Sequence, residues 1–296
     1  MDTSLLVITN SDAGSADEAA LDAAVTVLRQ GADVEVRATS APDELREVLG
    51  GAADRTVVVA GGDGSVHAVV QALHDMGALE GRTLGLIPLG TGNDFARTLG
   101  IPLDAAEAAR VLLDGTPRPT DLVVDDEGHV TVNNVHVGAG AEAGKEGARW
   151  KRHLGRIGYA VGALRVALDP PTLRVRVEVD EEVVADTDHA VLMVAVGNGA
   201  SVGGGTEITP DADPHDGLAD VLVATPERLL ARLGYLLRLP LGRHPEHEAV
   251  RIVRGRTISV SGSPFDCNSD GEIDGPVGRR TWRIVPAAYA MVVPAP

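Results

Sequence analysis

The sequence predicts an α/β protein with two domains: a doubly wound N-terminal domain built on a parallel sheet, and a β-rich, sandwich-like C-terminal domain. From Leu5 to about Thr120, short apolar runs alternate with helical patterns, whereas after Thr120 short apolar runs are separated mainly by turns. The 296 residues, 44% of them hydrophobic, can fill one large core or two medium ones. We therefore expect domains at 1–120 and 121–285.

The elements of the first half follow from their apolar patterns. Buried strands are expected at Leu5–Thr9, Val34–Ala38, Thr56–Ala60 and Thr83–Pro88. Helices are expected at Ala16–Gln30, Pro42–Leu49, Val66–Met76 and Phe95–Leu99 with Ala105–Leu113. In an open parallel sheet of this kind, ligands bind at the carboxyl ends of the strands.

The second half is predicted to be mostly strands. These are expected at Leu122–Val124, Val130–Val137, Leu173–Val179, Ala190–Val196, Leu218–Val223, Thr257–Ser261 and Trp282–Val285. Two helical stretches interrupt them, near Ala148–Leu168 and Pro226–Leu237.

Composition excludes several classes of protein. The 26 basic and 43 acidic residues give a net charge of −17, which repels nucleic acid and argues against a nucleic-acid partner. Cys267 is the single cysteine and cannot form an internal disulfide. A single cysteine, together with an N-terminal apolar run that has no basic residues beside it, indicates a cytoplasmic protein. Because no segment reaches about 20 apolar residues, any membrane contact is expected to be peripheral.

A glycine-rich turn follows the third predicted strand. It reads Gly61-Gly62-Asp63-Gly64-Ser65, and a helical pattern begins at Val66. Glycines let backbone N–H groups approach an anion, and the helix N-terminus favours negative charge, so the turn suits a phosphate. It lacks the Gly-Lys-Ser/Thr of a Walker loop, and His67 stands where a dinucleotide fingerprint has its third glycine. The alternative is a tight turn with Asp63 facing solvent.

A second such turn follows the fourth predicted strand. It reads Gly90-Thr-Gly-Asn-Asp-Phe-Ala-Arg97, and Asn93 or Asp94 is expected to cap the next helix. Capping does not require the two glycines and Thr91 as well. Two glycine-rich turns on neighbouring strands therefore indicate a nucleotide-phosphate site.

These two motifs together resemble the diacylglycerol kinase type of lipid kinases, which includes sphingosine and ceramide kinases and bacterial relatives. The resemblance implies a three-layer, Rossmann-like N-terminal domain, an active site in the cleft between the domains, and the use of ATP and Mg²⁺. It also implies that residues 286–296 return as a strand to the first domain.

The resemblance extends over nearly the whole chain. Asn10 to Gly14 resembles the family's Asn-Pro-x-Ser-Gly turn, with Ser11 in place of proline and Ala13 in place of serine. The other matching positions are Thr39, Asp121, Asn134 with Gly138, the Gly203-Gly-Gly205 run, Pro210 to Asp220, Asp270-Gly-Glu272 and Ile284-Val-Pro286.

Site residues are carried over from the family by position. Phosphoryl transfer needs positioning, charge neutralisation and a carboxylate that accepts the attacking hydroxyl's proton. The resemblance implies Glu272 as that acceptor, Asp63 near the phosphates and catalytic magnesium, and Asp121 as a support from the domain junction. The implied nucleotide-binding residues are Asn10, Ser11, Asp12, Ala13, Gly14, Thr39, Gly61, Gly62, Asp63, Gly64, Ser65, Val66, His67, Thr91 and Asn93. The alternative for Asp270-Gly-Glu272 is a hairpin turn, which Asp-Gly commonly forms.

The resemblance also implies a separate structural magnesium at Asp213, Asp216 and Leu218, where side-chain and backbone oxygens suit a hard cation. The alternative is an Asx-type turn that precedes a strand.

Two segments suggest contact with a membrane surface. The stretch from Ala148 to Arg165 has apolar residues at helical spacing, with Trp150 and the basic residues Arg149, Lys151, Arg152 and Arg156 near its start. The leucines and arginines between Arg228 and Arg238 raise the same possibility. Core packing with a solvated basic face is the alternative for both.

The sequence therefore indicates an ATP- and Mg²⁺-dependent lipid kinase, with diacylglycerol as the acceptor that the resemblance favours. We expect it to lie peripherally at the inner face of the membrane, with a homodimer possible. Two alternatives are a small-molecule kinase similar to the NAD kinases and a nucleotide- or lipid-binding protein without catalysis.

Overall fold

The computed structural model describes residues 3–11, 15–52, 55–138, 173–226 and 242–295, together with residues 231, 234, 235 and 238. Asp12, Ala13, Gly14 and the expected helix near Ala148–Leu168 lie outside the described residues. The chain forms two compact units. Unit 1 comprises Met1–Leu122, Gly203–Gly205 and Val285–Pro296, and unit 2 comprises Val123–Val202 and Thr206–Ile284.

Unit 1 contains a parallel sheet in the order β2-β1-β3-β4, to which the end of β16 adds a further parallel strand through Ala290 and Met291. The strands are β1 (Thr3–Asn10), β2 (Ala32–Thr39), β3 (Thr56–Gly61), β4 (Thr83–Pro88) and β16 (Glu272–Val293). The order reverses between β1 and β3. This reversal is the topological switch point at which open α/β sheets bind ligands.

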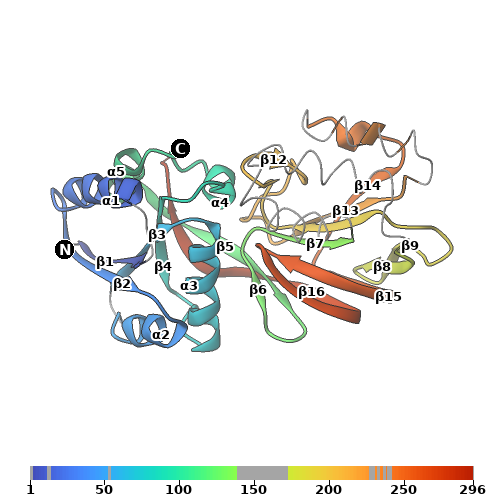
Figure 1. The fold of residues 1–296 in the computed structure, drawn as a ribbon, viewed down its shortest axis with the longest axis horizontal. Helices are drawn as coiled ribbons and strands as arrows, with labels where there is room; N and C mark the ends of the chain where they lie inside the picture. Colours follow the sequence, from blue (N-terminus) through green and yellow to red (C-terminus); the bar gives the residue numbers. More distant parts are fainter. Residues whose placement is uncertain are drawn as a thin grey trace. The chain divides into compact units, whose positions relative to one another are not determined.

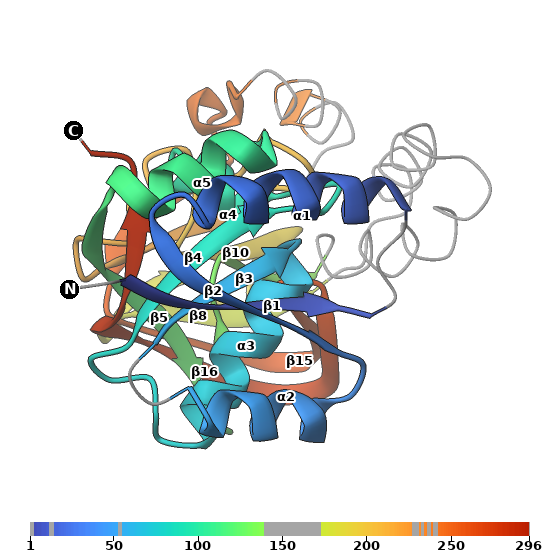
Figure 2. The ribbon, with the colours of Figure 1, turned by 90° about the vertical axis from the view of Figure 1, so that its left-hand side faces the viewer.

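Helices cover both faces of this sheet (Figure 2). α1 (Ser15–Leu28) and α5 (Ala105–Asp114) pack together on one face, and α2 (Pro42–Gly50) and α3 (Asp63–Asp75) pack on the other. The short helix α4 (Asp94–Thr98) follows β4. Apolar residues occupy both faces of β3 and β4, as a sheet covered on both sides requires. The predicted doubly wound domain is confirmed.

Unit 2 is an antiparallel β structure (Figure 1). Its main strand order is β14-β13-β10-β7-β15-β16, with β8 on β15, β9 on β8 and β6 on β5. The strands are β5 (Thr116–Asp125), β6 (Val130–Thr131), β7 (Asn134–Gly138), β8 (Val175–Val179), β9 (Glu182–Ala185), β10 (Met193–Gly197), β11 (Ser201–Val202), β12 (Thr206–Glu207), β13 (Ala219–Ala224), β14 (Val250–Gly255) and β15 (Thr257–Ser269), with a 3-10 turn at His244–Glu246.

The largest core cluster of unit 2 lies on one face of these strands, and a second cluster, which includes Met193, Ala195 and Leu222, covers the opposite face of β10 and β13. Trp282 is buried in the largest cluster among valines of β7, β8, β10 and β13. Alternation of buried and exposed residues along β8 reflects a sheet with one covered face. The predicted β-rich second domain is confirmed.

The last two strands are longer than the sequence predicts. Gly262, Pro264 and Gly275 are typical breakers, so the expected strands were short. In the structure β15 continues to Ser269, because register shifts between Ser261 and Cys267 absorb these residues. Within the described ranges, the chain contains no helix with the length and apolar character needed to cross a bilayer.

Candidate active site

The predicted nucleotide-binding residues within the described ranges gather at one edge of the unit 1 sheet. Asn10, Thr39 and Gly61 end the parallel strands β1, β2 and β3, so their carboxyl ends meet at the switch point. The backbone N–H of Ser11 donates to the Thr39 carbonyl at 3.1 Å, and the Leu89 N–H donates to the Gly61 carbonyl at 3.0 Å. The loops that follow these strands are therefore tied to one another.

The two glycine-rich turns touch through their backbones. A Cβ on Gly90 would lie 2.5 Å from the Gly62 Cα and 2.8 Å from the Asn93 Oδ1, and a Cβ on Gly62 would lie 3.0 Å from the Gly90 Cα. Real Cβ atoms essentially never lie closer than 3.0 Å to other atoms, so the packing of one turn against the other requires glycine at position 90 and leaves little room for a side chain at Gly62.

The packing of the two turns does not require a glycine at position 64. Gly64 lies exposed in the first turn of α3, and a Cβ there would meet no atom of the described residues within 4 Å. Ser65 is half-buried beside it, whereas the Val66 side chain is buried in the core. Because Gly64 has no side chain, open space remains beside it at the N-terminus of α3.

Asp63 holds the second turn in place. Its Oδ2 accepts the Asp94 N–H at 3.1 Å and its Oδ1 accepts the Phe95 N–H at 3.0 Å. These are the first amides of α4, so Asp63 caps this helix from another element. The expectation that Asn93 or Asp94 provides the cap is wrong. Asn93 is left-handed (φ 51°) and makes no side-chain cap, because it bonds the Gly90 N–H (3.0 Å) and carbonyl (2.7 Å) instead.

The Asp94 carboxylate is buried and binds the glycine triplet. It accepts the Gly204 N–H at 2.9 Å and the Gly205 N–H at 2.7 Å. Sequence reasoning treated Asp94 as a helix cap and missed this contact. The signal that could have found it is the run of three glycines, which offers adjacent amides without side chains.

A cavity of about 400 Å³ opens beside the second turn. Its lining includes Gly90, Thr91, Asn93 and Arg97, with Asp17 of α1 and Asp104 at the start of α5. Thr91 and Asn93, both predicted to contact nucleotide, therefore border an open volume on the α1 and α5 face of the sheet.

Asp121 is buried in unit 1. Its Oδ1 accepts the Ala287 N–H at 2.8 Å, where Ala287 is left-handed (φ 51°). This bond fixes a bend of β16 just before it joins the parallel sheet.

The Asp270-Gly-Glu272 segment forms a two-residue hairpin turn between β15 and β16. Asp270 and Gly271 have φ of 52° and 104°, and Ser269 pairs with Glu272. The segment is thus a hairpin turn, and it presents Glu272 as an exposed side chain.

The Asp270 carboxylate is an anchor for this turn. It accepts the N–H groups of Val132, Asn133 and Asn134 at 2.7, 3.0 and 3.0 Å. Buried amides extend the network, since Asn134 Nδ2 donates to the Gly199 carbonyl at 2.9 Å and Asn133 Nδ2 to the Ser201 carbonyl at 2.8 Å. The position of Glu272 therefore depends on a fully folded unit 2.

His136 lies on β7 with both ring nitrogens buried and without a hydrogen-bond partner among the described residues. Burial lowers the pKa of His136 to about 4, although the nearby Asp270 carboxylate opposes this shift. The imidazole is therefore neutral at pH 7.

The expected magnesium ligands form Asx-type turns. Asp213 Oδ1 accepts the His215 N–H at 3.1 Å, and Asp216 Oδ1 accepts the Leu218 N–H at 3.0 Å. Asp216 also pairs with Arg254. The contacts of this segment are those of the alternative that the sequence left open.

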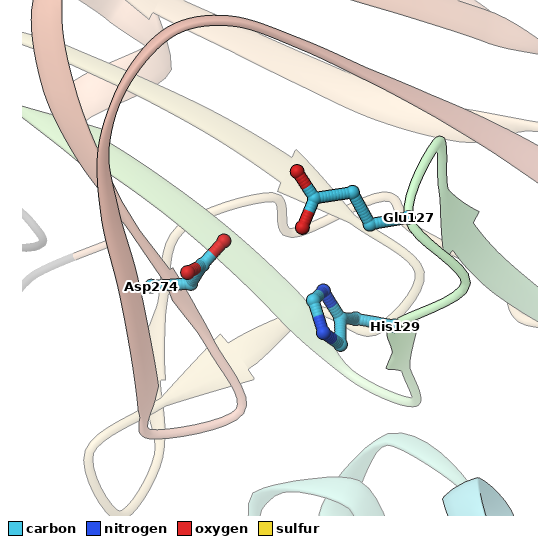
Figure 3. Close-up of side chains that lie close together, drawn as sticks. All are labelled: Glu127, His129 and Asp274. Carbon is cyan, nitrogen blue, oxygen red and sulfur yellow. The ribbon is translucent and has the colours of Figure 1, made fainter.

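A different acidic cluster was not predicted. Glu127 and His129 on one loop face Asp274 on β16 (Figure 3), and their ligand atoms lie within 4.8 Å of one another. The buried guanidinium of Arg280 pairs with Glu127 at 3.2 Å and also with Asp274 and Asp125. Arginine thus supplies the positive charge at this cluster.

Comparisons with known proteins agree with this geometry. The diacylglycerol kinase catalytic domain family matches residues 4–124, and the YegS C-terminal NAD kinase beta sandwich-like domain family matches residues 133–293. A crystal structure of a diacylglycerol kinase from Bacillus anthracis superposes with a TM-score of 0.79 at 26% identity, covering 98% of this chain and 96% of the other. The fold is thus that of the diacylglycerol kinase class.

Relatives with curated descriptions identify a more specific family within this class. A "Probable lipid kinase YegS-like" of Cronobacter sakazakii is 34% identical over 92% of this chain and 89% of its own length. A protein of the same description from Pseudomonas aeruginosa PAO1 is 32% identical over 99% and 95%. The chain belongs to the YegS-like lipid kinase family.

The contact of the two turns predicts unequal effects of added methyl groups. Gly90→Ala should lower the free energy of unfolding by about 1–3 kcal/mol, because the new Cβ clashes with backbone. Gly64→Ala, the matched control in the first turn, should change it little. Urea denaturation of both variants measures the difference, and equal stabilities would contradict the packing argument.

The buried imidazole predicts a pH dependence of stability. An unfolded histidine takes up a proton near pH 6.5, whereas His136 does so only near 4, so stability should fall as the pH drops between these values. The loss attributable to this group should be about 2–3 kcal/mol at pH 4.5. Urea unfolding at pH 7 and pH 4.5 should show a smaller decrease for His136→Phe than for the wild type. An identical decrease in both would show that His136 is not responsible.

Proposed function

We propose that the protein is an ATP-dependent lipid kinase that transfers the γ-phosphoryl group to a lipid hydroxyl, with diacylglycerol as acceptor and phosphatidic acid as product. The observation that carries the proposal is the close contact of the two glycine turns at the same edge of the parallel sheet at which β1 and β2 end in Asn10 and Thr39. The solved relative described as a diacylglycerol kinase supports the choice of acceptor.

The nucleotide would enter as its magnesium complex and bind through the loops after β1 to β4. The exposed start of α3 at Gly64 offers backbone amides and a favourable helix dipole to the phosphates. Thr91 and Asn93 would contact the nucleotide from the cavity beside the second turn. Asp63 keeps the two turns in register through its bonds to α4.

Glu272 is proposed as the general base. Its carboxylate would take the proton of the acceptor hydroxyl while that oxygen bonds to the γ-phosphorus. The bond from the γ-phosphorus to the bridging oxygen breaks, and ADP leaves with that oxygen. Exposure of Glu272 on a rigid hairpin supports this role, because a base must be reachable and held in one position.

An assay with radiolabelled ATP and a panel of lipids and NAD tests the proposal. Label in the organic phase, with diacylglycerol as the preferred substrate, is the expected result. Label in the aqueous phase with NAD would identify a small-molecule kinase. No transfer to any acceptor would leave a binding protein and refute the proposed activity.

Glu272→Gln should lower kcat in this assay by about 100-fold or more, because the amide cannot accept the proton. The affinity for ATP, measured by calorimetry, should stay near the wild-type value. The control is Glu182→Gln, an exposed change on β9, which should leave kcat unaltered. An active Glu272→Gln variant would remove this residue from the mechanism.

Gly64→Val should weaken ATP binding by about 10-fold, since a branched side chain would fill the space kept for phosphate. The melting temperature reports separately on the fold, because the Cβ meets no atom within 4 Å in the part of the chain that the structure describes. Unchanged ATP affinity in a stable Gly64→Val protein would place the phosphates elsewhere.

A further inference from the structure

The acidic turn between Pro210 and Asp220 in unit 2 is the segment for which the family resemblance implies a structural magnesium. Asp213 and Asp216 offer hard oxygens there, which is the correct chemistry for such an ion. The turn is nevertheless defined by its own bonds, from the His215 N–H to Asp213 and from the Leu218 N–H to Asp216.

A positive charge already reaches these carboxylates from the neighbouring strand. Arg254 on β14 lies opposite Asp220 on β13 in the sheet register. Its Nε donates to Asp220 Oδ2 at 3.1 Å, and its terminal nitrogen pairs with Asp216 Oδ2. One guanidinium therefore bridges the acidic turn and the strand that follows it.

Asp220 needs this partner. Its side chain is only 3% exposed, and burial raises the pKa of this carboxyl while Arg254 lowers it. The hydrogen bond that Arg254 donates to Asp216 raises the pKa of Arg254, so the guanidinium stays charged. A buried carboxylate whose counter-ion is removed destabilises the fold strongly.

The same arrangement is unfavourable for the binding of a divalent ion to Asp216. Both oxygens of Asp216 already accept hydrogen bonds, one from the Leu218 N–H and one from Arg254. Magnesium requires a close, near-octahedral shell of oxygens, and a guanidinium at that carboxylate repels it. The residues as arranged do not fit the implied metal.

We propose that the Arg254 guanidinium is the resident cation of this turn and takes the place of a structural magnesium. Unit 2 then keeps the turn without any divalent ion. This inference concerns the fold and stands apart from the kinase activity.

The first test compares the melting temperature of the wild-type protein, without nucleotide, in EDTA and in millimolar Mg²⁺. The two values should agree within about 1 °C, since no ion binds to the folded turn. A rise in Mg²⁺ that Asp216→Asn abolishes would overturn the proposal.

The second test removes the guanidinium. Arg254→Gln should lower the melting temperature by roughly 5 °C, because Asp220 stays buried without its partner. The matched control is Arg251→Gln on the same strand, whose ion pair with Glu182 is exposed on both sides and should matter little. Equal melting temperatures for the two variants would refute the role of Arg254. Should Arg254→Gln fail to fold, the wild-type comparison decides alone.

Discussion

The direct contact between the Gly62 and Gly90 backbones is the constraint on which the candidate nucleotide site depends. It brings the ends of β3 and β4 together, and the Asp63 carboxylate fixes the approach by bonding the first amides of α4. Asp94, held in this way, reaches the amides of Gly204 and Gly205. A single close approach thus orders three glycine-rich segments that are far apart in the sequence.

Much of the fold could be predicted because apolar periodicity in the first half is strong and regular. The strands of the parallel sheet end at Asn10, Thr39, Gly61 and Pro88, within a residue or two of their expected positions. β15 could not be predicted at full length, because long-range pairing with β16 and β8 overrides the local preferences of Gly262 and Pro264. Local propensity says nothing about such pairing.

The sequence predicted which residues lie at the candidate site better than it predicted what each of them does there. Sequence spacing indicated a loop at Asp63 but could not show that its carboxylate caps a helix thirty residues later. In the same way, Asp270 looked like an ordinary turn residue, yet it gathers three backbone amides from residues 132–134. Such contacts depend on tertiary structure, which pattern alone does not contain.

The open space at Gly64 has a practical consequence for following the protein in solution. The single native thiol, Cys267, is buried, and burial raises its pKa to about 12, so it reacts poorly with alkylating reagents. A cysteine introduced at position 64 would be exposed and sterically tolerated. A fluorophore could therefore be attached beside the helix start without first removing any native cysteine, giving a uniquely labelled chain.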